Sequence, residues 1–194
     1  MRLVIPAASL EIGRVHLSPF EERHGEGKLI APLSYNDTNF KMKDIEIITP
    51  VLTIDMYDAA AGHIRFATGP AKSPSSIFAT KLNTLQEYII STLHLHQSSI
   101  LGRTDLSRDT ISRCFQKLFN DDFINIYIAQ NDIRTPIFTT DYTKPTFGLM
   151  KHFAEGAQGQ KVRIVLKISG LRVLHGMPFR FRLHHTLMGV YIVD

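Results

Sequence analysis

The stretch that decides the fold is Lys161-Val-Arg-Ile-Val-Leu-Lys-Ile-Ser-Gly170, which is followed after a turn by Phe179-Arg-Phe-Arg182. In the first run, charged or polar residues alternate with aliphatic residues, with a single break at Val165. Alternation with a period of two is typical of a β-strand that has one face toward a core and one toward solvent. The second run alternates phenylalanine with arginine in the same way. We therefore predict that the two runs pair as a curved ribbon with one cationic face.

A cationic ribbon with aromatic rings beside it suits a flexible polyanion whose bases can stack. Single-stranded nucleic acid has this chemistry. An ordinary sandwich hairpin with solvated charges would show the same alternation, so one hairpin by itself leaves both interpretations open.

Further strands are predicted on both sides of a helical middle. Phe40–Ile48 alternates well until Pro50 follows, and proline cannot donate to a central ladder. Val51–Met56 and His63–Ala67 predict a hairpin, and alternation returns at Phe123–Ile128.

The clearest helix is predicted from Ile77 to His96, where apolar residues recur at spacings of three and four. A second helix is predicted from Arg108 to Phe119. Strands, one or two central helices and then strands again indicate a single domain over residues 1–194. Its class is α+β and mainly β, with a helical insertion at about 75–120.

Composition limits the classes of function. The 194 residues are 44% hydrophobic and 21% charged, which is ordinary for a soluble globular protein. The net charge of +4 permits an anionic partner without requiring one. The single cysteine, Cys114, excludes an internal disulfide and a cysteine-rich zinc site. No apolar run approaches the roughly 18 residues of a membrane-spanning helix, and residues 1–10 are too short and broken for a secretory signal. We expect a soluble intracellular protein with no membrane partner.

Motifs for catalysis are missing from the sequence. There is no phosphate-binding loop, dinucleotide fingerprint or nucleophile elbow. His94 and His96 lie two apart on a predicted helix, so they point in different directions and cannot share a metal there. Asp121 and Asp122 lack the converging acids of a magnesium-dependent nuclease. We therefore expect that the protein is not an enzyme and needs no metal or cofactor.

Cations beside aromatic residues recur along the chain, which favours the nucleic-acid interpretation. The cations would contact phosphates. The aromatic rings would stack on bases, and each stack would contribute roughly 1–3 kcal/mol to binding. Strand register decides which phenylalanines face the ligand. The predicted binding residues are Phe40, Lys41, Lys43, Arg65, Tyr142, Lys144, Phe147, Lys161, Arg163, Lys167, Phe179, Arg180, Phe181 and Arg182.

A competing interpretation concerns Thr104–Ile124, which resembles the recognition helix and wing of a winged helix-turn-helix protein. Ser112, Arg113 and Gln116 would then face a DNA groove. Phe123 would open the wing. The preceding helix is long, and the strands on both sides exceed what a wing needs, so this interpretation ranks lower.

Two segments carry a resemblance: Tyr35…Phe40-Lys-Met-Lys…Ile48-Thr-Pro50 and Lys161-Val-Arg-Ile-Val-Leu-Lys-Ile-Ser-Gly-Leu-Arg172. With them, the layout over about half the chain is similar to that of the single-stranded DNA-binding proteins of large DNA viruses and some phages. The resemblance implies an antiparallel OB-like barrel with inserted helices, with a sandwich as the alternative. It also implies action in a host nucleus or replication compartment. The chain departs from the family in having no acidic tail after Val193-Asp194, the feature with which many members recruit replication partners.

We therefore expect sequence-tolerant binding of single-stranded nucleic acid, with DNA favoured over RNA, in replication, recombination or repair. The alternative is a non-enzymatic structural or assembly protein with a β-sandwich, such as a virion component. A winged-helix binder of duplex DNA ranks third. A homo-oligomer is compatible with each of these.

Overall fold

Strands dominate the computed structural model, which describes residues 3–23, 28–120, 122–128, 134–139, 145–148, 153, 156–174 and 180–193. The helices are α1 (Pro74–Leu95), α2 (Gln97–Leu101) and α3 (Arg108–Cys114). The strands are β1 (Ile5–Pro6), β2 (Val15–Leu17), β3 (Glu21–Arg23), β4 (Lys28–Asn36), β5 (Lys41–Met42), β6 (Ile45–Ile48), β7 (Leu52–Asp58), β8 (His63–Ala67), β9 (Phe123–Tyr127), β10 (Pro136–Phe138), β11 (Thr146–Phe147), β12 (Lys161–Leu174) and β13 (Arg180–Val193). The predicted α+β class with strands in the majority is confirmed.

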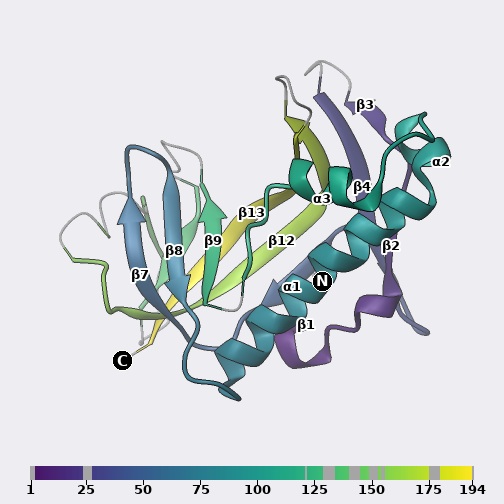
Figure 1. Cartoon of the computed structure of the whole chain (residues 1–194). Helices are drawn as coiled ribbons and strands as arrows, with labels where there is room; N and C mark the ends of the chain where they lie inside the picture. Colours follow the sequence, from purple (N-terminus) through teal and green to yellow (C-terminus); the bar gives the residue numbers. More distant parts are fainter. Residues whose placement is uncertain are drawn as a thin grey trace.

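The two longest strands, β12 and β13, form the predicted antiparallel ribbon and run through the middle of the molecule (Figure 1). The edge of β12 that faces away from β13 pairs with three strands, one after another along its length. β7 pairs with its start, β6 with its middle and β4 with its end. The second alternating run belongs to β13, which continues without interruption to Val193. The ribbon is therefore the element to which most of the sheet is attached.

The sheet curls but stays open. From β12 it continues through β7 and β8 to β9, each pair antiparallel. At the far edge, β9 comes close to β13, where the Tyr127 N–H donates to Nε2 of His185 at 2.9 Å. A side chain holds this seam, and no backbone ladder joins β9 to β13 among the described residues. The barrel of the predicted OB-like architecture is thus not closed here.

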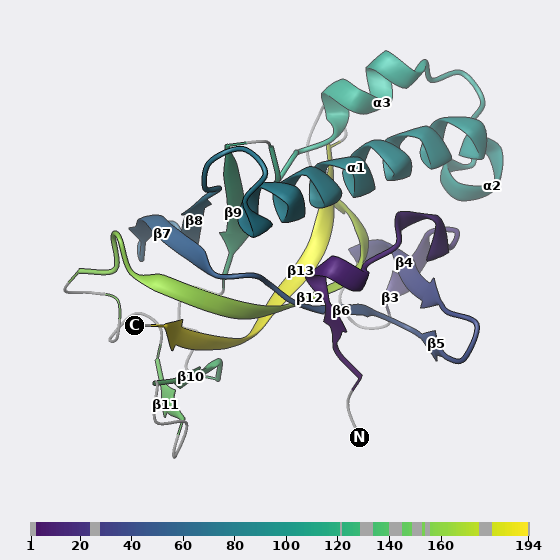
Figure 2. The same ribbon diagram turned by 90° about the horizontal axis from the view of Figure 1, so that it is seen from below.

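Helix α1 forms where the sequence supplies a cap and an apolar stripe. The Ser73 hydroxyl accepts the Ser76 N–H at 3.2 Å, and Pro74 begins the helix with a preset φ. The predicted range from Ile77 to His96 is close to the observed one. Its buried side chains and the apolar face of the ribbon belong to one core cluster. In Figure 2 the three helices lie on one side of the ribbon, and β10 and β11 lie on the other.

The second predicted helix is wrong at its C-terminal end. Helix α3 begins at Arg108 as predicted but ends at Cys114, and the chain continues extended. Gln86, buried on α1, explains the change, because its Oε1 accepts the N–H groups of Leu118 and Phe119 at 2.8 and 3.3 Å. Those N–H groups are therefore not available for helical bonds.

The predicted strand Phe40–Ile48 is also corrected, because it divides into β5 and β6. β5 pairs with β4, whereas β6 pairs with β1 and β12, so the chain changes partner at Lys43 and Asp44. None of the described helices has the length and apolar character needed to span a bilayer.

Candidate nucleic-acid interface

One face of the β12–β13 ribbon is apolar and buried, and the other is polar. Two register shifts, after Val165 and after Ile168, keep this alternation in phase along both strands. Met188 and Ser169 are the extra residues at these shifts. We call the polar side the basic ribbon face. Its cations are Lys161, Arg163, Lys167 and Arg172 from β12 and Arg180 and Arg182 from β13.

Lys167, at the centre of this face, is neutralised by a neighbour. Its Nζ lies 2.6 Å from Oδ2 of Asp44, the residue before β6, and both side chains are about two-thirds buried or more. The remaining cations form two groups on either side of this ion pair. We call Lys161 and Arg163 the ribbon base, and Arg172, Arg180 and Arg182 the ribbon tip.

The ribbon base combines exposed cations with aromatic rings. Lys161 and Arg163 are exposed and make no ion pair within the described residues. Arg163 lies opposite Tyr191 across the ladder, and the Tyr191 ring stacks on Phe138 with centroids 4.7 Å apart and planes at 11°. Phe138 is also the register partner of Tyr191 on β10. A row of ring, ring and cation therefore crosses three strands.

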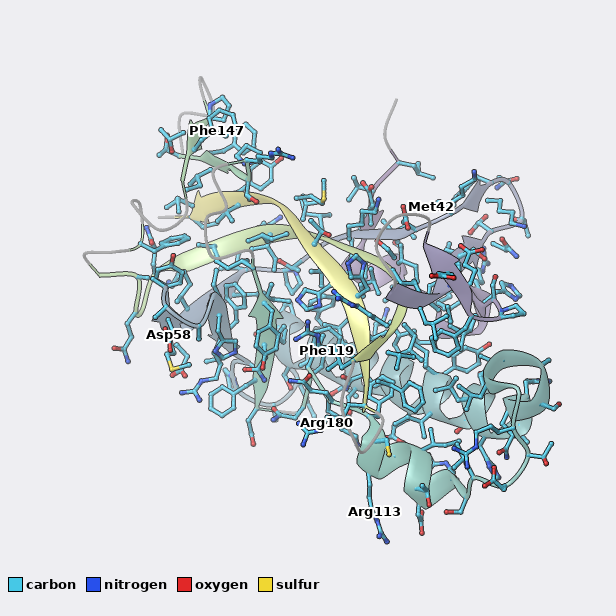
Figure 3. All side chains as sticks on the ribbon, turned by 90° about the horizontal axis from the view of Figure 1, so that it is seen from above. Met42, Asp58, Arg113, Phe119, Phe147 and Arg180 are labelled. Atoms are coloured by element: carbon cyan, nitrogen blue, oxygen red, sulfur yellow. The ribbon has the colours of Figure 1, made fainter. Side chains whose placement is uncertain are left out.

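Phe147 adds an exposed ring at the same end. Its side chain is 57% exposed, and it lies opposite Pro136, two residues before Phe138 on the same face of β10. Figure 3 shows Phe147 near one end of β13 and Arg180 at the other end. The two residues thus mark the extent of the basic ribbon face.

The ribbon tip is a cross-strand pair of arginines held against an aromatic ring. Arg172 and Arg182 are register partners. The Arg182 guanidinium carbon lies 4.8 Å from the centroid of Tyr127. Burial lowers the pKa of Arg182, and the positive charge of Arg172 acts in the same direction. The Tyr127 ring also lies 5.0 Å from that of His63.

A cavity of about 430 Å³ opens beside the Tyr127 ring. Its walls include Arg134 and Met188, together with Thr186 of the basic ribbon face. This volume lies in the range of small-ligand sites, roughly 300–1,000 Å³. The cavity therefore has room for a small ligand.

Several predicted binding residues lie away from the ribbon or are engaged elsewhere. Phe40 is half-buried and stacks on Tyr35 with centroids 6.3 Å apart. Lys41 and Lys43 are exposed, on β5 and just after it. Arg65 pairs with Asp55 and lies 4.6 Å from the centroid of the Phe123 ring.

The remaining predicted binding residues outside the basic ribbon face are Phe181 and three residues that the structure does not describe. Phe181 is only 5% exposed and packs against Phe20, so its ring belongs to the apolar face of the ribbon. Tyr142, Lys144 and Phe179 lie outside the described residues.

The fold brings to this face three residues that were not among the predicted binding residues: Tyr127, Tyr191 and Arg172. Alternation in Phe123–Tyr127 indicates which side chains share a face, but the approach of β9 to β13 is a tertiary feature. Arg172 joins the other cations only because the shift after Ile168 restores its phase.

The residues that the structure describes contain no group of three or more His, Cys, Asp or Glu side chains able to hold a metal ion. Comparison with protein-family models, curated proteins and solved structures gave no match.

Proposed function

We propose that this protein binds single-stranded nucleic acid along the basic ribbon face, with little dependence on sequence and with DNA as the favoured ligand. The observation that carries the proposal is the register of β12 and β13, which gathers cations from both strands on one face while the other face packs in the core. A polyanion laid along this face meets cations at both the ribbon base and the ribbon tip.

Aromatic rings favour a single strand over a duplex. Base stacking requires exposed base faces, which a duplex does not offer. Phe147 and the Phe138–Tyr191 pair supply rings at the ribbon base. Every base has a π-face, so stacking on these rings does not depend on the identity of the base. This agrees with the low sequence dependence that we propose.

The Lys167–Asp44 ion pair makes the centre of the basic ribbon face less attractive to phosphate than its two ends. A lysine already paired with a carboxylate attracts a phosphate less strongly than a free lysine does. Affinity should therefore depend on the ribbon base and the ribbon tip more than on the centre. We further propose that the curl from β12 to β9 serves as an OB-like barrel does, by presenting one curved strand surface to the ligand, in replication, recombination or repair.

Salt dependence tests the proposal. Each phosphate contact on a single strand contributes about 0.7 to the slope of log affinity against log salt. Replacing Lys161 and Arg163 together by alanine should therefore weaken binding of a labelled dT oligomer and reduce that slope by about 1.4 units. Fluorescence anisotropy from low to moderate salt measures both quantities.

Lys41→Ala is the matched control, because Lys41 is an exposed cation on β5, away from the ribbon. It should leave affinity and slope as in the wild type. A folded double variant with the wild-type slope would show that these residues touch no phosphate. Loss of binding in Arg113→Ala, together with stronger binding of duplex than of single strands, would favour the winged-helix alternative. No salt-sensitive binding at all would favour a structural or assembly protein.

A further inference from the structure

The ribbon tip places like charges directly opposite each other, which is unfavourable in a sheet. Arg172 and Arg182 are register partners on adjacent strands and point to the same face. Arg180, exposed, is the next residue on that face of β13. Such a concentration of positive charge needs a compensating group.

Within the described residues, no carboxylate supplies that compensation. Neither Arg172 nor Arg182 takes part in an ion pair there, and Nε of Arg172 is buried without a hydrogen-bond partner. Other arginines of the chain do have carboxylate partners. These are Arg14, Arg65, Arg103 and Arg108. The tip is therefore a site with unused donors and unbalanced charge.

The tip is also held in place by its surroundings. Arg182 lies over the Tyr127 ring, whose hydroxyl accepts from Nε2 of Gln116 at 3.3 Å. The Gln116 N–H donates to the Phe181 carbonyl at 2.7 Å, which ties this support back to β13. A guanidinium fixed in this way loses little freedom when a ligand arrives.

We infer that the ribbon tip is a subsite for a phosphate monoester, the group at a phosphorylated end of a nucleic-acid strand. A monoester carries about −1.5 to −2 charges at neutral pH and three strong acceptor oxygens, more than an internal phosphodiester offers. Two facing arginines match this charge and accept such oxygens in bidentate geometry. The inference rests on the proposed function, and it adds that a strand is anchored by its end at the tip and runs toward the ribbon base.

Competition between oligonucleotides tests the inference. The probes are dT12 with a 5′-phosphate, with a 3′-phosphate and with hydroxyl groups at both ends. Wild-type protein should prefer one phosphorylated strand over the unphosphorylated strand by about tenfold, the effect of one added charge-assisted hydrogen bond. Arg172→Met keeps much of the side-chain volume and removes the charge, so this ratio should fall to about one. Arg163→Met should weaken all three strands by a similar factor and leave the ratio unchanged.

Inorganic phosphate provides an independent measurement. At equal ionic strength, phosphate should raise the thermal unfolding midpoint of the wild type above that in chloride, and the rise should be absent in Arg172→Met. Arg182→Gln serves in the same role if Arg172→Met does not fold.

The outcomes separate this inference from the proposed function. Equal affinity for all three strands in the wild type would overturn the monoester subsite and leave single-strand binding intact. A phosphate effect that persists in both arginine variants would overturn the assignment to the tip. If no strand binds but phosphate stabilises the wild type and not the variants, the subsite stands with a free phosphate monoester as ligand, and the proposed function falls.

Discussion

At position 185, an imidazole side chain bridges the two strands that approach each other at the seam, β9 and β13. Its Nε2 accepts the Tyr127 N–H, and its Nδ1 lies 3.1 Å from the Leu183 carbonyl oxygen. Since Nε2 accepts a hydrogen bond, the proton of the neutral ring belongs on Nδ1, where it donates to Leu183. The seam between β9 and β13 therefore requires a neutral histidine.

This requirement predicts acid sensitivity. Burial lowers the pKa of His185 to about 4, whereas the ordinary value in an unfolded chain is 6.5. Between these values the unfolded chain binds a proton that the folded protein does not, so the free energy of unfolding is highest above pH 6.5 and falls as pH drops toward 4. A difference of about 2.5 pKa units corresponds to a loss of about 3 kcal/mol.

Urea unfolding at several pH values between 7.5 and 4.5 measures this loss. His185→Gln removes the titration, so its stability should decline less steeply over the same interval. His96→Gln, a change at an exposed position, should decline as the wild type does. An unchanged pH slope in His185→Gln would mean that another group controls acid unfolding.

At the scale of single elements, β12 depends on a glycine where β4 crosses it. A Cβ built at Gly170 would lie 2.5 Å from the Ala31 carbonyl oxygen and 3.0 Å from Cγ2 of Ile30. The backbone of β4 pairs with β12 at this point, so it cannot move away without breaking the ladder. Glycine is needed here for close approach.

Gly170→Ala should therefore lower the free energy of unfolding by about 1–3 kcal/mol, the usual range for overpacking. Gly189→Ala on β13 is the matched control, since its nearest atoms would lie 3.8–3.9 Å from the new Cβ. Thermal or urea unfolding compares the two. Equal stability of both variants would show that β4 yields easily at this crossing.

Local pattern predicted the elements whose signals are long and regular. The ribbon strands, the β7–β8 hairpin and helix α1 could all be inferred from alternation or from spacings of three and four. The end of α3 could not, because Gln86 on another element captures the N–H groups of Leu118 and Phe119. The division of Phe40–Ile48 into β5 and β6 likewise depends on which distant strands pair with each half.

For the whole molecule, the candidate site results from long-range pairing. The sequence predicted a cationic face on each ribbon strand, and the register unites them. It could not predict that Asp44 would neutralise Lys167 or that Phe181 would be buried against Phe20. It also could not predict that Tyr127, distant in sequence, would lie under Arg182. The electrostatic character of the basic ribbon face therefore depends on tertiary contacts, although the alternation in each strand can be predicted from the sequence.

The most direct measurement of the central claim is an NMR titration of isotope-labelled protein with dT12, followed through backbone amide shifts. We predict saturable shifts in β12 and β13 at the ribbon base and the ribbon tip, together with Tyr127 on β9, and little change in α3. Shifts concentrated in Arg108–Cys114, with β12 and β13 unaffected at saturation, would contradict the assignment of the basic ribbon face as the nucleic-acid interface.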